Sequence, residues 1–141
     1  MTQEQLLKDT INYYSANPAK RRCVNKKLGA CYYSPKRAYK PLSEGCAIGR
    51  HLTPEAKIAF DDLASSDSDM TTISAIMEVG ANKAMMPSWM QEMPVGLLAD
   101  IQRLHDVENH WDSSGLTKIG KRAVNYIINR YSLDMAPLAV D

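Results

Sequence analysis

A basic segment that also contains tyrosines, residues 20–50, is the part of the sequence whose side chains could bind a charged ligand. It carries nine lysines and arginines against one acid. Guanidinium and ammonium groups complement phosphate, while tyrosine rings stack on bases or donate hydroxyl hydrogen bonds. The segment therefore predicts a site for a small anionic, nucleotide-like ligand. We expect anion contacts from Lys36, Arg37, Tyr39, Lys40 and Arg50, and stacking from Tyr32 or Tyr33.

An acidic block follows this basic segment. Residues 51–112 hold eleven acids and three bases, so the formal net charge of +1 hides two opposed blocks. The acidic block would repel a long polyanion, which favours a short nucleotide over a single-stranded nucleic acid. The alternative is that the basic segment neutralises the acidic helices of the same molecule or simply stays hydrated.

A second candidate anion site is the stretch from Gly45 to Pro54. Glycines flank a short predicted strand, and Arg50 precedes a helix start, so backbone amides and one guanidinium could meet an anion there. The stretch lacks the glycine-lysine-serine or glycine-lysine-threonine end of a phosphate loop. The alternative is a strand-to-helix turn in which glycine permits close packing.

The cysteines and histidines are the residues whose side chains could bind a metal ion or act as a nucleophile and base. Their spacing shows neither paired Cys-x-x-Cys units nor a His-Glu-x-x-His helix, so we expect no metal and no cofactor. A Cys46–His105 nucleophile pair would require the two side chains to be close. The chain's cysteines and histidines are Cys23, Cys31, Cys46, His51, His105 and His110.

His105 has two interpretations. It lies in register with Leu97, Leu98 and Ile101, so it is either a buried, hydrogen-bonded histidine or a catalytic base. On an ideal helix the neighbouring Asp106 points elsewhere. The sequence alone therefore does not assign Asp106 as the dyad partner of His105.

Apolar spacing predicts the helices that must position these groups. Thr2 and Gln5 form a capping box, and Asn17-Pro18 ends the first helix. Thr53-Pro54 begins another helix with a cap and a proline at the first helical position. The predicted helices span about residues 3–15, from 54 onward, 70–79, from 95 to near 111, and 116–132.

Two β-compatible runs, residues 28–33 and 45–49, predict a small hairpin. The expected fold is a predominantly helical α+β domain, residues 1–141, with about five helices packed on that hairpin. No apolar run reaches the length of a membrane span, and the N-terminus has no secretory pattern. We therefore expect a cytoplasmic protein with no membrane partner.

A methionine-rich stretch, residues 85–93, contains four methionines and Trp89. Methionine adapts its shape easily, so the stretch either fills gaps in a small core or forms an adaptable binding surface.

Three motifs occur in order: Cys31-Tyr32, then Gly45-Cys46-Ala47-Ile48-Gly49, then Leu98-x-x-Ile101-Gln102-x-Leu104-His105-Asp106 with Trp111. The pattern resembles a small, largely uncharacterised family of bacteriophage and bacterial proteins with Cys-x-Tyr, Cys-Ala-Ile-Gly and Leu-Gln-x-x-His-Asp segments. The resemblance implies a phage-associated origin, with the bacterial host's cytoplasm as location. Here the loop between the cysteine motifs is longer and more basic, and Arg50-His51 follows where many members have another cysteine or an apolar residue.

These observations predict a phage-associated protein that sequesters an anionic, nucleotide-derived defence signal of its host. Sequestration requires only affinity, which suits a sequence without a coherent catalytic motif, so we expect binding rather than catalysis. The alternative is an inhibitor that covers a host enzyme or defence complex through residues 85–93 or through its opposed charged faces. A homo-oligomer could enclose a ligand at its subunit interface.

Overall fold

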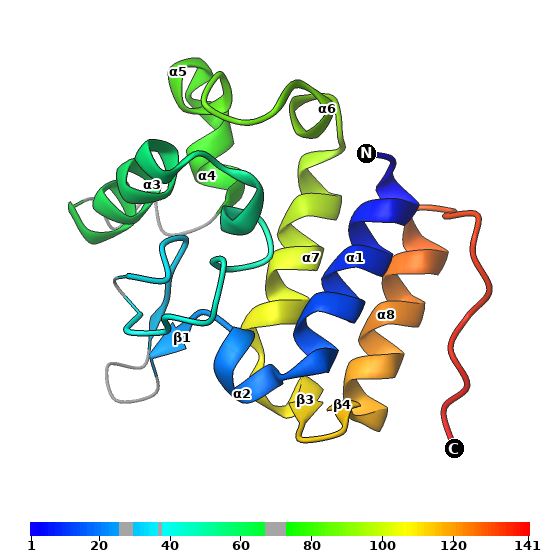
Figure 1. Cartoon of the computed structure of the whole chain (residues 1–141). Coiled ribbons are helices and arrows are strands. Elements are labelled where there is room, and N and C mark those ends of the chain that lie inside the picture. The colour runs from blue at the N-terminus through cyan, green and yellow to red at the C-terminus, as the bar shows by residue number, and fades with distance from the viewer. Residues whose placement is uncertain (26–29, 37, 67–72) are drawn as a thin grey trace.

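Three helices that are far apart in the sequence lie side by side (Figure 1). They are α1 (Gln3–Ala16), α7 (Val95–Asp106) and α8 (Lys118–Arg130), and α7 contacts both of the others. The structure is a computed structural model that describes residues 1–25, 30–36, 38–66 and 73–141. Leucines and isoleucines of α1 and α7 are buried in one hydrophobic cluster that also includes residues of α8.

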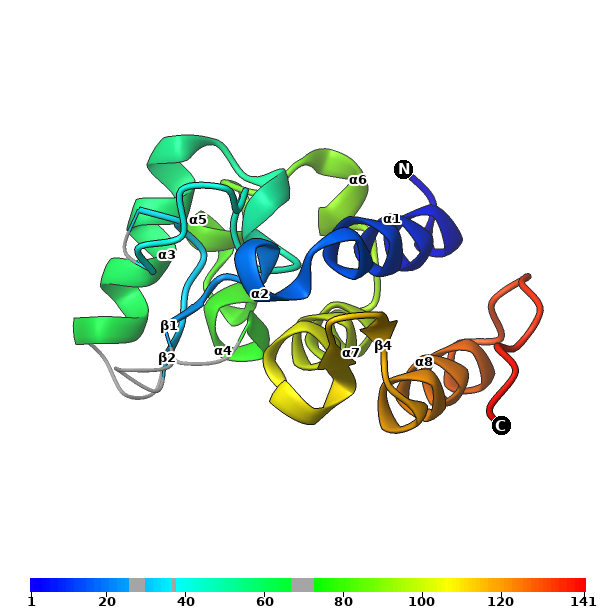
Figure 2. The same cartoon turned by 60° about the horizontal axis from the view of Figure 1, so that its bottom comes forward.

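The remaining helices lie mainly on the other side of α7 from α8 (Figures 1 and 2). Helix α4 packs directly on α7. These helices are α2 (Pro18–Arg21), α3 (Pro54–Ser66), α4 (Ile73–Glu78), α5 (Gly80–Lys83) and α6 (Ser88–Gln91). Two short 3-10 helices, η1 (Gly49–His51) and η3 (Glu108–His110), complete the described helical elements.

Predicted caps set the starts of two helices. Thr2 and Gln5 form the capping box of α1: Thr2 Oγ1 accepts from Gln5 N–H at 3.1 Å, and Gln5 Oε1 accepts from Thr2 N–H at 2.7 Å. At the start of α3, Thr53 Oγ1 accepts from Ala56 N–H at 3.2 Å, and Pro54 is the first helical residue. The sequence predictions for both starts are confirmed.

The α+β class is confirmed, but the helix count and the hairpin differ from the prediction. The described residues form eight α-helices rather than about five. Three of the eight have only four residues each, which is too short to leave a periodic pattern. None of the described helices has the length and apolar character needed to cross a membrane.

The prediction of a second strand at residues 45–49 is wrong. Strand β2 (Ala30–Cys31) pairs instead with β1 (Val24–Asn25), in antiparallel register. Residues 46–48 form a turn whose three consecutive side chains are all buried, whereas a half-buried strand would alternate. A second hairpin joins β3 (Trp111–Asp112) to β4 (Gly115–Leu116), between the last two predicted helices. Residues 28 and 29 of the first predicted strand lie outside the described residues.

Candidate functional site

A cavity of about 530 Å³ lies against α7 and the chain around β2. Its volume falls within the range of small-molecule sites. It combines aromatic, charged and amide side chains, which is the mixture that gives a ligand both contact area and orientation. The cavity is lined by Tyr32, Tyr33, Cys46, Ile73, Ser74, Ala99, Asp100, Gln102, Arg103 and Asp106.

Helix α7 supplies half of this lining from one stripe. Ala99, Gln102, Arg103 and Asp106 follow the i, i+3, i+4, i+7 spacing of one helix face, and Asp100 lies at its margin. The opposite stripe is fully buried in the core and consists of Leu97, Leu98, Ile101 and Leu104. One helix therefore presents a polar face to the cavity and an apolar face to the core.

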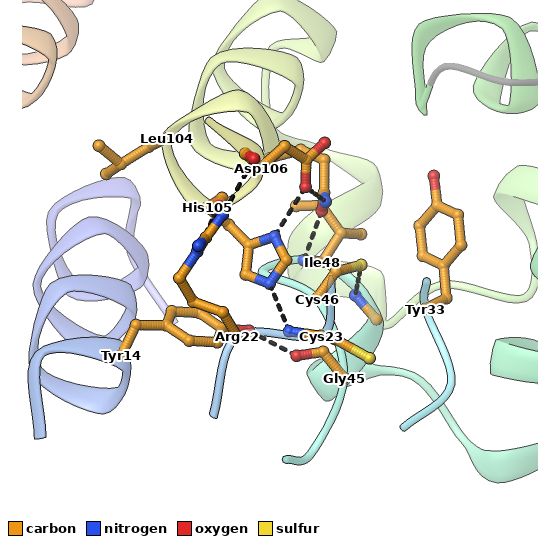
Figure 3. Close-up of polar contacts among 12 residues, drawn as sticks. Tyr14, Arg22, Cys23, Tyr33, Gly45, Cys46, Ile48, Leu104, His105 and Asp106 are labelled. Atoms are coloured by element: carbon orange, nitrogen blue, oxygen red, sulfur yellow. Dashed lines mark hydrogen bonds and ion pairs between the residues drawn. The ribbon is translucent and has the colours of Figure 1, made fainter. Parts of the chain in front are cut away.

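His105 is held at both ring nitrogens (Figure 3). Its Nε2 accepts a hydrogen bond from the backbone N–H of Cys23 at 2.9 Å. The proton of the neutral ring must then be on Nδ1, which donates to Asp106 Oδ1 at 2.7 Å. Burial lowers the pKa of His105, which favours this neutral form. Neither nitrogen remains available as a general base, so His105 is a structural residue here.

The expectation that Asp106 points away from His105 is wrong. Asp106 is the last residue of α7, and the chain turns to an extended conformation at Val107. The short side chain of Asp106 reaches back to His105 and also accepts a hydrogen bond from Gln102 Nε2 at 2.7 Å. Gln102 Oε1 in turn accepts from the backbone N–H of Ile48 at 3.1 Å. The network joins the end of α7 to the 46–48 turn.

Arg22 also binds the C-terminal end of α7. Its Nε donates to the carbonyl oxygen of His105 at 2.8 Å, and its Nη2 donates to that of Asp106 at 3.0 Å. These carbonyls have no partner within the helix, so a cation is favourable at this position. At least this member of the basic segment therefore binds backbone carbonyl groups of the protein itself.

The predicted ligand-binding residues fall in three places. Tyr32 and Tyr33 line the cavity. Lys36, Tyr39 and Lys40 line a separate hollow with two prolines, and Lys40 Nζ donates to the carbonyl of Ala19 at 2.9 Å. Arg37 lies outside the described residues.

Arg50, the remaining predicted contact, is apart from both groups. Its guanidinium pairs with Asp9 and with Glu44, the latter at 3.0 Å, and packs on the Tyr13 ring at 3.9 Å from the centroid. The Arg50 guanidinium therefore lines neither the cavity of Tyr32 and Tyr33 nor the hollow of the lysines.

The turn from Gly45 to Gly49 uses its backbone amides within the protein. Gly45 N–H donates to Ser43 Oγ at 3.1 Å, and Gly49 N–H donates to Cys46 Sγ at 3.3 Å. Ile48 N–H donates to Gln102, as described above. These amides form no anion cradle, and the close-packing interpretation of the glycines agrees with the geometry.

The described thiols are buried and poorly suited to nucleophilic chemistry. Burial raises the pKa of Cys23 to about 12 and also raises that of Cys46. The side chain of Cys31 lies outside the described residues. Across the described part of the chain, no group of three or more His, Cys, Asp or Glu side chains is placed to hold a metal ion.

Sequence reasoning missed four polar residues of the cavity: Ser74, Asp100, Gln102 and Arg103. The sequence signal for these residues was a polar stripe on the helix that begins after Pro94, but such a stripe also fits a hydrated outer face.

Comparison of the chain with family models, curated proteins and solved structures finds no match.

Proposed function

We propose that the protein binds a small nucleotide-like ligand in the cavity between α7 and the residues that follow β2, and withholds it from its receptor. The observation that carries the proposal is the convergence of Tyr32, Arg103 and Asp106 on one cavity of ligand size. An aromatic ring offers a surface for a base, a guanidinium pairs with phosphate, and a carboxylate accepts hydrogen bonds.

The charge of the cavity limits how such a ligand could lie. Asp100 and Asp106 outnumber Arg103 among the lining residues, so an anion is favoured only near Arg103. Arg103 is exposed, whereas Gln102 and Asp106 are half-buried. The phosphate is therefore assigned to the Arg103 edge, and the base to the space beside Tyr32 and Asp106.

Binding without turnover agrees with the chemistry of the site. Both nitrogens of His105 are engaged, and burial raises the pKa of the Cys46 thiol. That the ligand is a defence signal of a bacterial host rests on the resemblance to phage proteins.

Calorimetry against a panel of linear and cyclic nucleotides tests the proposal. We expect saturable binding of at least one nucleotide, with a matching rise in melting temperature. Arg103→Gln should weaken that binding about 10- to 100-fold, the usual worth of a charge-assisted hydrogen bond. Arg122→Gln, which removes the same charge from an exposed position on α8, should leave it unchanged. Absence of both heat and thermal shift across the panel contradicts the proposal.

The alternative, a protein-binding inhibitor acting through residues 85–93, gains no support from the placement of that stretch. Met86, Met90 and Met93 are buried in the core. Trp89 is half-buried, and its ring meets that of His51 edge-on with centroids 5.4 Å apart. The methionines therefore fill gaps between helices and present no continuous exposed patch.

A further inference from the structure

The two carboxylate oxygens of Asp106 have different surroundings. Oδ1 receives two hydrogen bonds, from His105 Nδ1–H and from Gln102 Nε2–H, both at 2.7 Å. Two donors occupy both lone pairs of that oxygen. Within the described part of the chain, no protein donor reaches Oδ2. Figure 3 shows this second oxygen directed away from the His105 ring.

The two donors also fix the orientation of the carboxylate. The Cys23 N–H occupies Nε2 of His105, so the histidine proton is on Nδ1 and must be donated. Gln102 is similarly fixed, because its oxygen accepts from Ile48 N–H and its amino group must therefore face Asp106. Rotation of the carboxylate would break a bond to each partner. Asp106 thus presents Oδ2 as a fixed hydrogen-bond acceptor.

The side chain of Asp106 is 34% exposed and lines the cavity. A carboxylate oxygen attracts a ligand N–H and repels a carbonyl oxygen at the same place. We infer that the cavity selects a nucleotide whose base carries an exocyclic amino group, which donates to Oδ2 of Asp106 while the phosphate lies near Arg103. This inference rests on the proposed function and adds the chemical class of the base.

Two pairs of nucleotides test the inference directly. Cytidine and uridine 5′-monophosphates differ in an amino group replaced by a carbonyl and in the adjacent ring nitrogen. Adenosine and purine riboside 5′-monophosphates differ in an amino group replaced by hydrogen. We expect the amino-bearing member of a pair to bind about 10- to 100-fold more tightly, as measured by calorimetry.

Asp106→Asn gives the sharper result. Both neighbours are donors, so the amide oxygen of the variant must face His105 and Gln102, and its amino group then replaces Oδ2. The variant should prefer uridine over cytidine monophosphate, which inverts the wild-type order. Asp134→Asn, which makes the same change at an exposed position beyond α8, should keep the wild-type order.

The outcomes separate the two proposals. If the paired nucleotides bind equally well to the wild-type protein, nucleotide binding stands and the role of Asp106 is overturned. If none of the four binds, the inference is overturned, and the nucleotide premise falls with it only when the whole calorimetry panel also shows no binding. Should Asp106→Asn fail to fold, the wild-type comparison of the two pairs still decides the inference.

Discussion

Individual residues near the cavity have their chemistry decided by hydrogen-bond partners that are distant in sequence. His105 meets the backbone of Cys23, and its tautomer follows from that single contact. Its spacing with Leu97, Leu98 and Ile101 predicted a buried histidine, and the structure confirms the burial. The spacing could not distinguish a structural histidine from a catalytic one, because the partner is on another element.

His51 provides a test at the residue scale through pH. Within the described residues, its buried Nε2 makes no hydrogen bond and lies 3.7 Å from Asp9 Oδ2. Burial, with Arg50 adjacent, lowers the pKa of His51 from 6.5 to about 4. The unfolded chain therefore takes up a proton at a higher pH than the folded protein does.

This difference predicts that the free energy of unfolding falls as pH drops from about 6.5 toward 4, by at most about 3 kcal/mol from His51. Lowered pKa values at His105 and His110 act with the same sign. Urea denaturation at a series of pH values measures the slope. His51→Gln should flatten it in this interval, and an unchanged slope would contradict the assignment.

The elements differ in how far the sequence predicts them. Long helices such as α1, α7 and α8 leave several turns of periodic pattern, and their predicted spans are confirmed to within a few residues except near Trp111, where the helix ends at Asp106. The apolar run at residues 45–49 was misassigned because a short buried turn and a short strand have the same composition. The cavity was missed because it forms only when α7, α4 and β2 come together.

Substitution of Gly49 tests the packing of the turn at residues 45–49. A Cβ on Gly49 would lie 2.5 Å from the carbonyl oxygen of Tyr33 and 2.7 Å from its Cα. Backbone cannot move aside cheaply, so we expect Gly49→Ala to lower the free energy of unfolding by about 2 kcal/mol. Among the described residues, no atom outside its chain neighbours and its own helix backbone lies within 4 Å of the Cβ position of Gly80, so Gly80→Ala is the matched control. Chemical denaturation should show that the control is as stable as the wild type; equal losses would refute the packing argument.

At the scale of the whole molecule, the near-neutral charge is partly an internal balance. Arg50 of the basic segment pairs with Asp9 and Glu44, and Arg22 binds the end of α7. The sequence showed two opposed charge blocks but not which members meet. The structure therefore assigns some basic residues to folding, while Lys36 and Lys40 line a hollow outside the cavity.

Thiol reactivity tests the packing of the whole molecule. Cys23 and Cys46 are buried, and burial raises the pKa of both. In a Cys31→Ser background, we expect neither thiol to react rapidly with a disulfide reagent at pH 8. Both should react as urea unfolds the protein, because Cys23 is 0% and Cys46 1% exposed in the folded state. A fast phase in native buffer that disappears in Cys46→Ser would contradict this packing.

The two faces of α7 separate the residues that keep the protein folded from those that touch the cavity. Gln102 and Asp106 contribute to both tasks, and Ala99 packs partly against the core, whereas the exposed Arg103 lines the cavity and belongs to neither the buried core nor the His105 network. A library randomised at position 103, with position 99 restricted to small residues, should therefore change ligand preference while most clones remain foldable. The helix would then serve as a tunable scaffold for new small-molecule receptors.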